Sequence, residues 1–327
     1  MSIVMTKERF RTLAIATLVV TVAVILWGAF VRATGSGAGC GSHWPTCNGE
    51  VLPRPKTLAT VIELTHRLTS GAVLLMVLLE LVWAFRVFPK DHPARAGAVA
   101  ATVLMLTEAL IGAALVLFEH VAQDRSVGRA AWMSVHLVNT FFLIAAITCT
   151  AFWGAGGAAP RLRGQSAVGA LTIAGAIGSV LVGVSGAITA LGDTLFAAPS
   201  LTQGIADDLS PTAHFLQQLR VIHPATAVLL AVFLLYARGA IAARRPAPAV
   251  KRASRALATL LIAQLALGFV NLALLAPIWT QILHLLLADL VWIAFVLLAA
   301  AALGERAKAP RVPAAGPEDA AALTAKS

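Results

Sequence analysis

Eight apolar segments dominate this sequence and leave few folds open to it. Each is near the roughly 20 residues that a helix needs to cross a bilayer, and they cover residues 11–31, 58–86, 96–118, 130–153, 166–190, 217–237, 255–276 and 280–303. In lipid, the backbone polar groups of such a segment must bond to one another, which favours helices. With 59% hydrophobic and only 12% charged residues, the composition is not that of a soluble globular protein. We therefore expect an all-α integral membrane protein with eight transmembrane helices.

The basic residues predict how these helices are oriented. Eighteen of the 25 Lys and Arg residues fall in the N-terminal segment, the even-numbered connections and the C-terminal tail, against six on the other side. Because basic loops stay inside, both termini are predicted to be cytoplasmic, as in a bacterial-type plasma membrane. The net charge of +10 then reflects topology rather than nucleic-acid binding. The first apolar run, at residues 13–31, is longer than a usual signal-peptide core, and we expect it to be a retained span.

The order of polar residues predicts an internal repeat. His66 and His223 are each followed by a threonine three residues later, and Glu108 and Gln264 each precede a glycine by four residues. Segments four and eight each carry one histidine near their starts. The simplest interpretation is two four-helix bundles, residues 10–153 and 166–303, related by a pseudo-twofold axis along the membrane normal. The polar, Ala/Pro-rich residues 304–327 are predicted to form a disordered cytoplasmic tail.

Four histidines lie at matching depths in this arrangement. They are roughly 6–12 Å inside the segments that enter from the outer face, and they are His66, His136, His223 and His284. One membrane histidine alone is usually a helix–helix hydrogen bond, and zinc prefers tighter clusters than this. Facing histidines in a helical bundle suit the axial positions of haem iron. We predict two haem sites near the outer face, one in each half.

The halves differ three residues before their first histidine. The N-terminal half has Glu63 there, and the C-terminal half has Arg220. Arginine suits a haem propionate, whereas a carboxylate in an apolar span can transfer a proton or stabilise charge. The alternative is that Glu63 pairs with Arg67 or another basic group and only stabilises the bundle.

The first outer loop carries a cysteine pair. Cys40 and Cys47 lie among turn-forming residues on the oxidising side of the membrane. A disulfide is the favoured interpretation; two free thiols, or a metal pair with His43, are the alternatives. Cys149 lies within the fourth segment, and we assign it no role.

The chain resembles the haem A synthase family over roughly residues 10–303. The resemblance is carried by the Glu63-Leu-Thr-His66-Arg67 signature, by Thr34-Gly-Ser-Gly37, by Cys40, Trp44-Pro45 and Cys47-Asn-Gly, and by the three later histidines. It implies an oxidoreductase of porphyrin biosynthesis that converts the C8 methyl of haem O to a formyl group, giving haem A for terminal oxidases.

The resemblance also implies roles for the site residues. His223 and His284 would bind a cofactor haem b, and His66 and His136 the substrate haem O, with Glu63 beside it as the catalytic carboxylate. Arg67 and Arg32 would then hold propionates, as Arg220 would in the second half. Cys40 and Cys47 match the family's first-loop pair, but the second pair of several members is missing, because residues 191–216 contain no cysteine.

The implied partners are haem O, a haem O synthase, cytochrome oxidase assembly and an unidentified electron donor or acceptor, in a lipid bilayer. A homo-oligomer is compatible with the sequence. The main alternative function is a diheme cytochrome b-type electron-transfer protein, although such proteins commonly place their haems at different depths. A transporter built from repeats is a second alternative. It would call for broken helices and for ionisable groups near the midplane, where this chain has only Asp289 and Glu108.

Overall fold

The computed structural model describes residues 6–51, 53–54, 57–161 and 163–304, and within them every named element is helical. Eight helical stretches there are long and apolar enough to cross a membrane. The first four are α1 (Lys7–Ala33), α2 (Leu58–Val87), α3 (Pro93–Leu117) and α4 (Val127–Gly154). The others are α5 (Ser166–Leu195), α7 (Phe215–Arg220) with α8 (Ile222–Arg244), α9 (Pro248–Ala273) and α10 (Ile278–Gly304). The all-α class and the eight spans are confirmed.

The sequence explains where several helices begin. Thr57 and Ser126 stand just before α2 and α4, and their hydroxyls accept hydrogen bonds from the backbone N–H groups of Thr60 and Arg129. Such caps satisfy donors that have no partner in the first turn. Helices α3 and α9 begin instead with a proline, which lacks the N–H that the first turn leaves unpaired.

The sixth span is broken, which the sequence prediction of one continuous helix at 217–237 missed. Helix α7 ends at Arg220, and α8 begins at Ile222, after Val221. Pro224 follows His223, so it cannot donate a hydrogen bond to the carbonyl of Arg220, and its ring crowds the preceding turn. The break therefore lies directly before a predicted ligand histidine.

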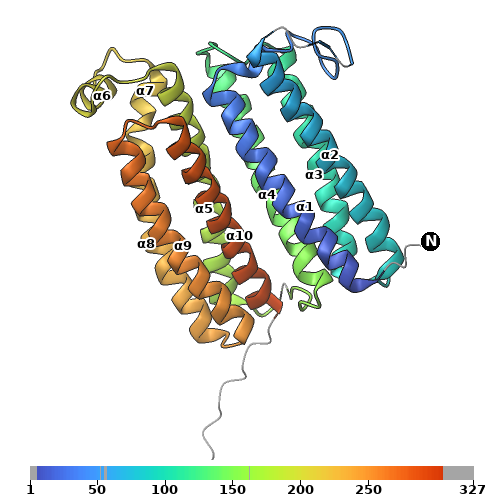
Figure 1. The fold of residues 1–327 in the computed structure, drawn as a ribbon. Coiled ribbons are helices and arrows are strands. Elements are labelled where there is room, and N and C mark those ends of the chain that lie inside the picture. Colours follow the sequence, from blue (N-terminus) through green and yellow to red (C-terminus); the bar gives the residue numbers. More distant parts are fainter. Residues whose placement is uncertain (1–5, 52, 55–56, 162, 305–327) are drawn as a thin grey trace, which may run out of the picture.

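The helices form two groups with the same order of neighbours. In the first, α1 contacts α2, α2 contacts α3, α3 contacts α4, and α4 contacts α1. In the second, α5, α8, α9 and α10 repeat this cycle. Figure 1 shows the two groups side by side, with the blue loop after α1 at the same end as α6 (Leu201–Asp208) and α7. We call this the loop end; the start of α1 and the end of α10 lie at the opposite end (Figure 1).

The two groups meet along a seam made by α1, α4, α5 and α10. Phe141 of α4 stacks on Trp292 of α10 with ring centroids 5.1 Å apart, and the Trp292 indole donates to the Phe141 carbonyl at 2.8 Å. A Cβ added at Gly183 of α5 would lie 2.9 Å from the Phe141 ring. The lack of a side chain at Gly183 therefore lets the Phe141 ring pack directly against α5.

The twofold axis, the cytoplasmic location of the termini, and the division of residues 10–153 and 166–303 into two functional units stay predictions. The predicted tail lies outside the described residues apart from Gly304.

Candidate functional site

Each of the four predicted ligand histidines faces a glycine on the preceding long helix of its own group. A Cβ built on these glycines would lie 2.9, 4.0, 2.9 and 3.1 Å from the Cε1 atom of the histidine, for the pairs Gly28–His66, Gly112–His136, Gly186–His223 and Gly268–His284. Real Cβ contacts essentially never fall below 3.0 Å. At Gly28 and Gly186 the missing side chain is therefore required for the ring to lie where it does. We call each of these contacts between a glycine and a histidine ring a glycine cradle.

The histidine pair of the second group has the spacing of two ligands to one metal ion. The ring centroids of His223 and His284 are 6.5 Å apart, and their planes are perpendicular at 88°. Two imidazoles that bind one ion from opposite sides place their centroids roughly 6–6.5 Å apart, because a metal–nitrogen bond is about 2 Å long and the nitrogen lies about 1.1 Å from its ring centre. The pair could therefore hold a haem iron.

Hydrogen bonds help to assign the tautomer of His223. The Ser185 hydroxyl donates to the Val182 carbonyl at 2.9 Å, so its oxygen is left to accept from Nδ1 of His223 at 3.0 Å. The imidazole Nε2 then carries the free lone pair that a metal ligand needs. The amide nitrogen of Gln264 lies 3.3 Å from Nε2 of His284. The buried Nδ1 of His284 has no hydrogen-bond partner among the described residues.

The histidines of the first group are His66 of α2 and His136 of α4. Nδ1 of His66 is buried without a hydrogen-bond partner in the part of the chain that the structure describes. Nδ1 of His136 lies 3.3 Å from Oε1 of Glu108, an ion-pair distance whose alignment falls outside hydrogen-bond geometry. Glu108 received no role from the sequence.

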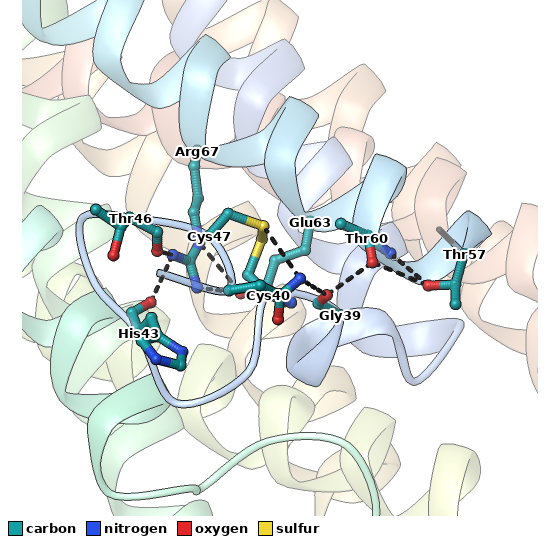
Figure 2. Close-up of a disulfide and its surroundings, with 10 residues drawn as sticks. Gly39, Cys40, His43, Thr46, Cys47, Thr57, Thr60, Glu63 and Arg67 are labelled. Atoms are coloured by element: carbon teal, nitrogen blue, oxygen red, sulfur yellow. Dashed lines mark hydrogen bonds and ion pairs between the residues drawn. A yellow bond between two sulfur atoms is a disulfide. The ribbon is translucent and has the colours of Figure 1, made fainter. Parts of the chain in front are cut away.

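Glu63 is buried, with 3% of its surface exposed, and holds the first loop onto α2 (Figure 2). Its Oε2 accepts a hydrogen bond from the backbone N–H of Cys40 at 2.8 Å, and its Oε1 forms an ion pair with Arg67. Arg67 donates in turn to the carbonyls of His43 and Thr46, at 2.7 Å each. The pairing of Glu63 with Arg67, which the sequence left as the alternative, is thus present.

The loop itself is closed by a disulfide between Cys40 and Cys47, which confirms the favoured prediction. The chain at Gly39 comes so close to α2 that an added Cβ would lie 2.4 Å from the backbone of Ala59. The Thr60 hydroxyl donates to the Gly39 carbonyl at 2.8 Å. Glu63, Arg67 and Thr60 therefore fasten the disulfide loop to the end of α2 (Figure 2).

The connection between α3 and α4 packs beside this loop. Ser42 donates to Glu119 at 3.2 Å, and Asp124 bonds to His120 and to the N–H and hydroxyl of Ser126, each at 2.8 Å. Partial burial alone would raise the pKa of the Asp124 carboxyl, but the hydrogen bonds with His120 and Ser126 outweigh it and lower the pKa. The carboxylate thus fixes the turn that leads into α4, the helix that carries His136.

The two other arginines predicted to hold propionates have protein partners. Arg32 of α1 donates to Ala190 and Thr194 of α5 at 2.6 Å each, and to Gln281 of α10 at 2.8 Å, so it crosses the seam. Arg220 is paired with Asp208 and Asp193, at 2.5 and 3.2 Å. The propionate role of all three arginines stays a prediction, since it would require these contacts to be shared or exchanged.

Comparison with known proteins decides the family. A family model described as cytochrome oxidase assembly protein, COX15-CtaA, matches residues 11–296. The chain belongs to this family. A protein from Thermus thermophilus, named protoheme IX farnesyltransferase, is 51% identical over 301 residues, covering 92% of this chain but 50% of that protein. The chain thus spans about half the length of this relative.

Shorter matches within the family carry another name. The protein named heme A synthase from Alkalihalophilus pseudofirmus is 38% identical over 111 residues, which is 34% of this chain and 37% of that protein. The one from Bacillus mycoides is 39% identical over 112 residues, again 34% of this chain, and 36% of that protein. Family membership thus places the chain among cytochrome oxidase assembly proteins, and its eight long apolar helices are those of an integral membrane fold.

Proposed function

We propose that this chain is a haem A synthase, which oxidises the C8 methyl of haem O to a formyl group. The observation that carries the proposal is the His223–His284 pair at the spacing of two axial ligands, together with a second histidine pair in the other group, whose rings also face glycines, closely at Gly28 and at ordinary contact distance at Gly112. Both lie in a chain of a family that contains proteins named heme A synthase. The glycine cradles, the buried unpartnered nitrogens and the neutral nitrogen donors all fit a haem.

The two halves would bind different haems. His223 and His284 would hold a cofactor haem b, which supplies one-electron chemistry when bound. His66 and His136 would hold the iron of the substrate haem O. Glu63 would take up a proton from the substrate or stabilise positive charge at the loop end of this site, where the Cys40 N–H and Arg67 fix its carboxylate. Both sites would lie near the outer face of the membrane.

The name protoheme IX farnesyltransferase belongs to relatives twice as long as the match, so the activity in that name need not reside in the matched half. The longer relatives instead support the proposal that a protohaem farnesyltransferase is the partner that delivers the substrate.

The test is to co-express this chain with a haem O-producing farnesyltransferase and to separate the extracted haems by chromatography and mass. We expect a haem with a formyl group, found only when both proteins are present. Protohaem or haem O alone, bound to purified protein, would instead indicate a diheme electron carrier. A protein without haem would indicate a different class, such as a transporter.

The cradles give a second prediction. In Gly186→Ala, the new Cβ would overlap Cε1 of His223 at 2.9 Å and displace the ring. Overpacking of this kind costs about 1–3 kcal/mol, so we expect haem binding in this half to weaken roughly 5- to 150-fold. Haem titration of the purified protein measures this change.

The matched control is Gly239→Ala on α8, where an added Cβ meets nothing within 4 Å. Both variants gain the same helix propensity from alanine. Equal haem binding by the two variants would contradict the cradle.

A further inference from the structure

Two polar side chains at matching sequence positions contact the second histidine of each group. Oε1 of Glu108 on α3 lies 3.3 Å from Nδ1 of His136, and the amide nitrogen of Gln264 on α9 lies 3.3 Å from Nε2 of His284. Both residues precede a glycine that faces the histidine by four positions, at Gly112 and Gly268. A carboxylate thus lies beside one candidate ligand and an amide beside the other, although the two touch different ring nitrogens.

Glu108 is held in position by a polar network between α3 and α4. Asn139 donates to its Oε2 at 2.5 Å, and the Thr140 hydroxyl donates to its Oε1. Asn139 is itself fixed, because it donates to the Leu104 carbonyl at 2.9 Å and accepts from Thr107 at 2.7 Å. Both oxygens of the carboxylate therefore have donors that aim it at His136.

The second group has no counterpart of this network. When the two groups are aligned by sequence on Glu108–Gln264 and His136–His284, Thr107 corresponds to Ala263. Asn139 and Thr140 correspond to Leu287 and Ala288. A carboxylate with its supporting donors occurs beside one histidine, and a neutral amide among apolar residues beside the other.

This difference has a chemical consequence for a metal-binding imidazole. A carboxylate beside the ring N–H of a metal-binding imidazole makes the imidazole a more basic ligand, and Oε1 of Glu108 lies at ion-pair distance from Nδ1 of His136. A more electron-donating ligand favours ferric over ferrous iron and lowers the reduction potential of a haem. A primary amide carries no charge in either orientation of its group, so its effect is smaller.

We propose that Glu108 is a positioning residue that makes His136 a stronger electron donor to a bound iron than His284 is. It therefore sets the reduction potential of a haem held by His66 and His136 below that of one held by His223 and His284. This inference rests on the proposed function in that both histidine pairs bind haem iron. It adds the order of the two reduction potentials and names Glu108 as the residue that sets this order.

The experiment uses the full-length protein in detergent, loaded with ferric protoporphyrin IX so that both sites hold the same haem, and an optical redox titration. His66→Ala and His223→Ala assign the two transitions. We expect the transition of the first group at lower potential, and Glu108→Gln to raise it by at least about 59 mV, a tenfold change in the ferric-to-ferrous ratio. Glu108→Asp should restore much of the low potential.

The reciprocal variant keeps the test independent of how Glu108→Gln folds. Gln264→Glu should lower the potential of the second group and leave the first unchanged. Glu80→Gln is the matched control, because Glu80 is also a buried carboxylate of the first group and stands 14 residues beyond His66 on α2, about 21 Å along the helix. It should move neither transition.

Unchanged potentials in both Glu108→Gln and Gln264→Glu, or haem bound by only one histidine pair, would overturn the inference. Failure of the proposed function looks different: two haems would bind in the expected order of potential, but no formyl haem would form from haem O.

Discussion

Replacing Glu63 with alanine is expected to stop haem A formation while the haem of the second group stays bound. Loss of a general acid or base typically lowers a rate by about 10²- to 10⁴-fold. His223 and His284 belong to another helix group, so their spectrum should persist. The measurement is the yield of formyl haem together with the optical spectrum of the purified protein. Normal haem A production in this variant would remove Glu63 from the chemistry.

The structure adds a competing explanation that needs its own control. Without Glu63, the N–H of Cys40 loses its acceptor and Arg67 is left with 13% of its side chain exposed and no counterion among its present contacts. Breaking a buried ion pair costs about 3–5 kcal/mol, so the disulfide loop is expected to loosen as well. Limited proteolysis between Cys40 and Cys47 reports this loosening directly.

Arg67→Ala separates the two roles, because it also breaks the ion pair and frees the loop carbonyls of His43 and Thr46. If Glu63 is catalytic, Arg67→Ala should loosen the loop but retain a measurable part of the activity, whereas Glu63→Gln should keep the loop and lose the activity. Equal losses in Arg67→Ala and Glu63→Ala, with full activity in Glu63→Gln, would show that the carboxylate only fastens the loop.

Replacing His223 or His284 with alanine is expected to abolish the spectrum of the resident haem. Each ring supplies one side of a pair whose centroids are 6.5 Å apart, so neither variant can keep two axial nitrogens on one iron. The change should be near-complete loss of the low-spin signal, read by absorption and electron paramagnetic resonance on protein purified without added haem.

Two comparisons make this test specific. His43→Ala removes a histidine of the loop whose backbone carbonyl, rather than its ring, contacts Arg67, and it should leave the spectrum unchanged. His66→Ala and His136→Ala should retain the resident haem. A spectrum that survives in His223→Ala but disappears in His66→Ala would reverse the assignment of the halves.

The sequence was sufficient to predict features that depend on spacing along the chain. Apolar length predicted the eight spans, and turn-forming residues around Cys40 and Cys47 predicted a closed loop. Matching positions of His66 and His223 within their spans also predicted a histidine pair at similar depth in each group, and this depth stays a prediction.

Features that depend on the rotation of helices could not be predicted in this way. A guanidinium reaches far from its backbone, so its partner is set by tertiary packing: Arg32 crosses to α5 and α10, and Arg220 turns to Asp208. The contact between Glu108 and His136 likewise needs two faces of α3 and α4 to meet. The break at Val221 was readable in principle, since Pro224 cannot complete the bond to Arg220.

The seam described above also bears on how such a protein can change over evolutionary time. Residues at the contact between α1, α4, α5 and α10 must fit both groups at once, so a substitution there needs a compensating one in the opposite group. Glu63 and Glu108, whose counterparts are Arg220 and Gln264, stand instead on α2 and α3, away from that contact. A duplicated ancestor could therefore acquire a second role in one copy by altering its peripheral helices, without disturbing the fit that keeps the copies together.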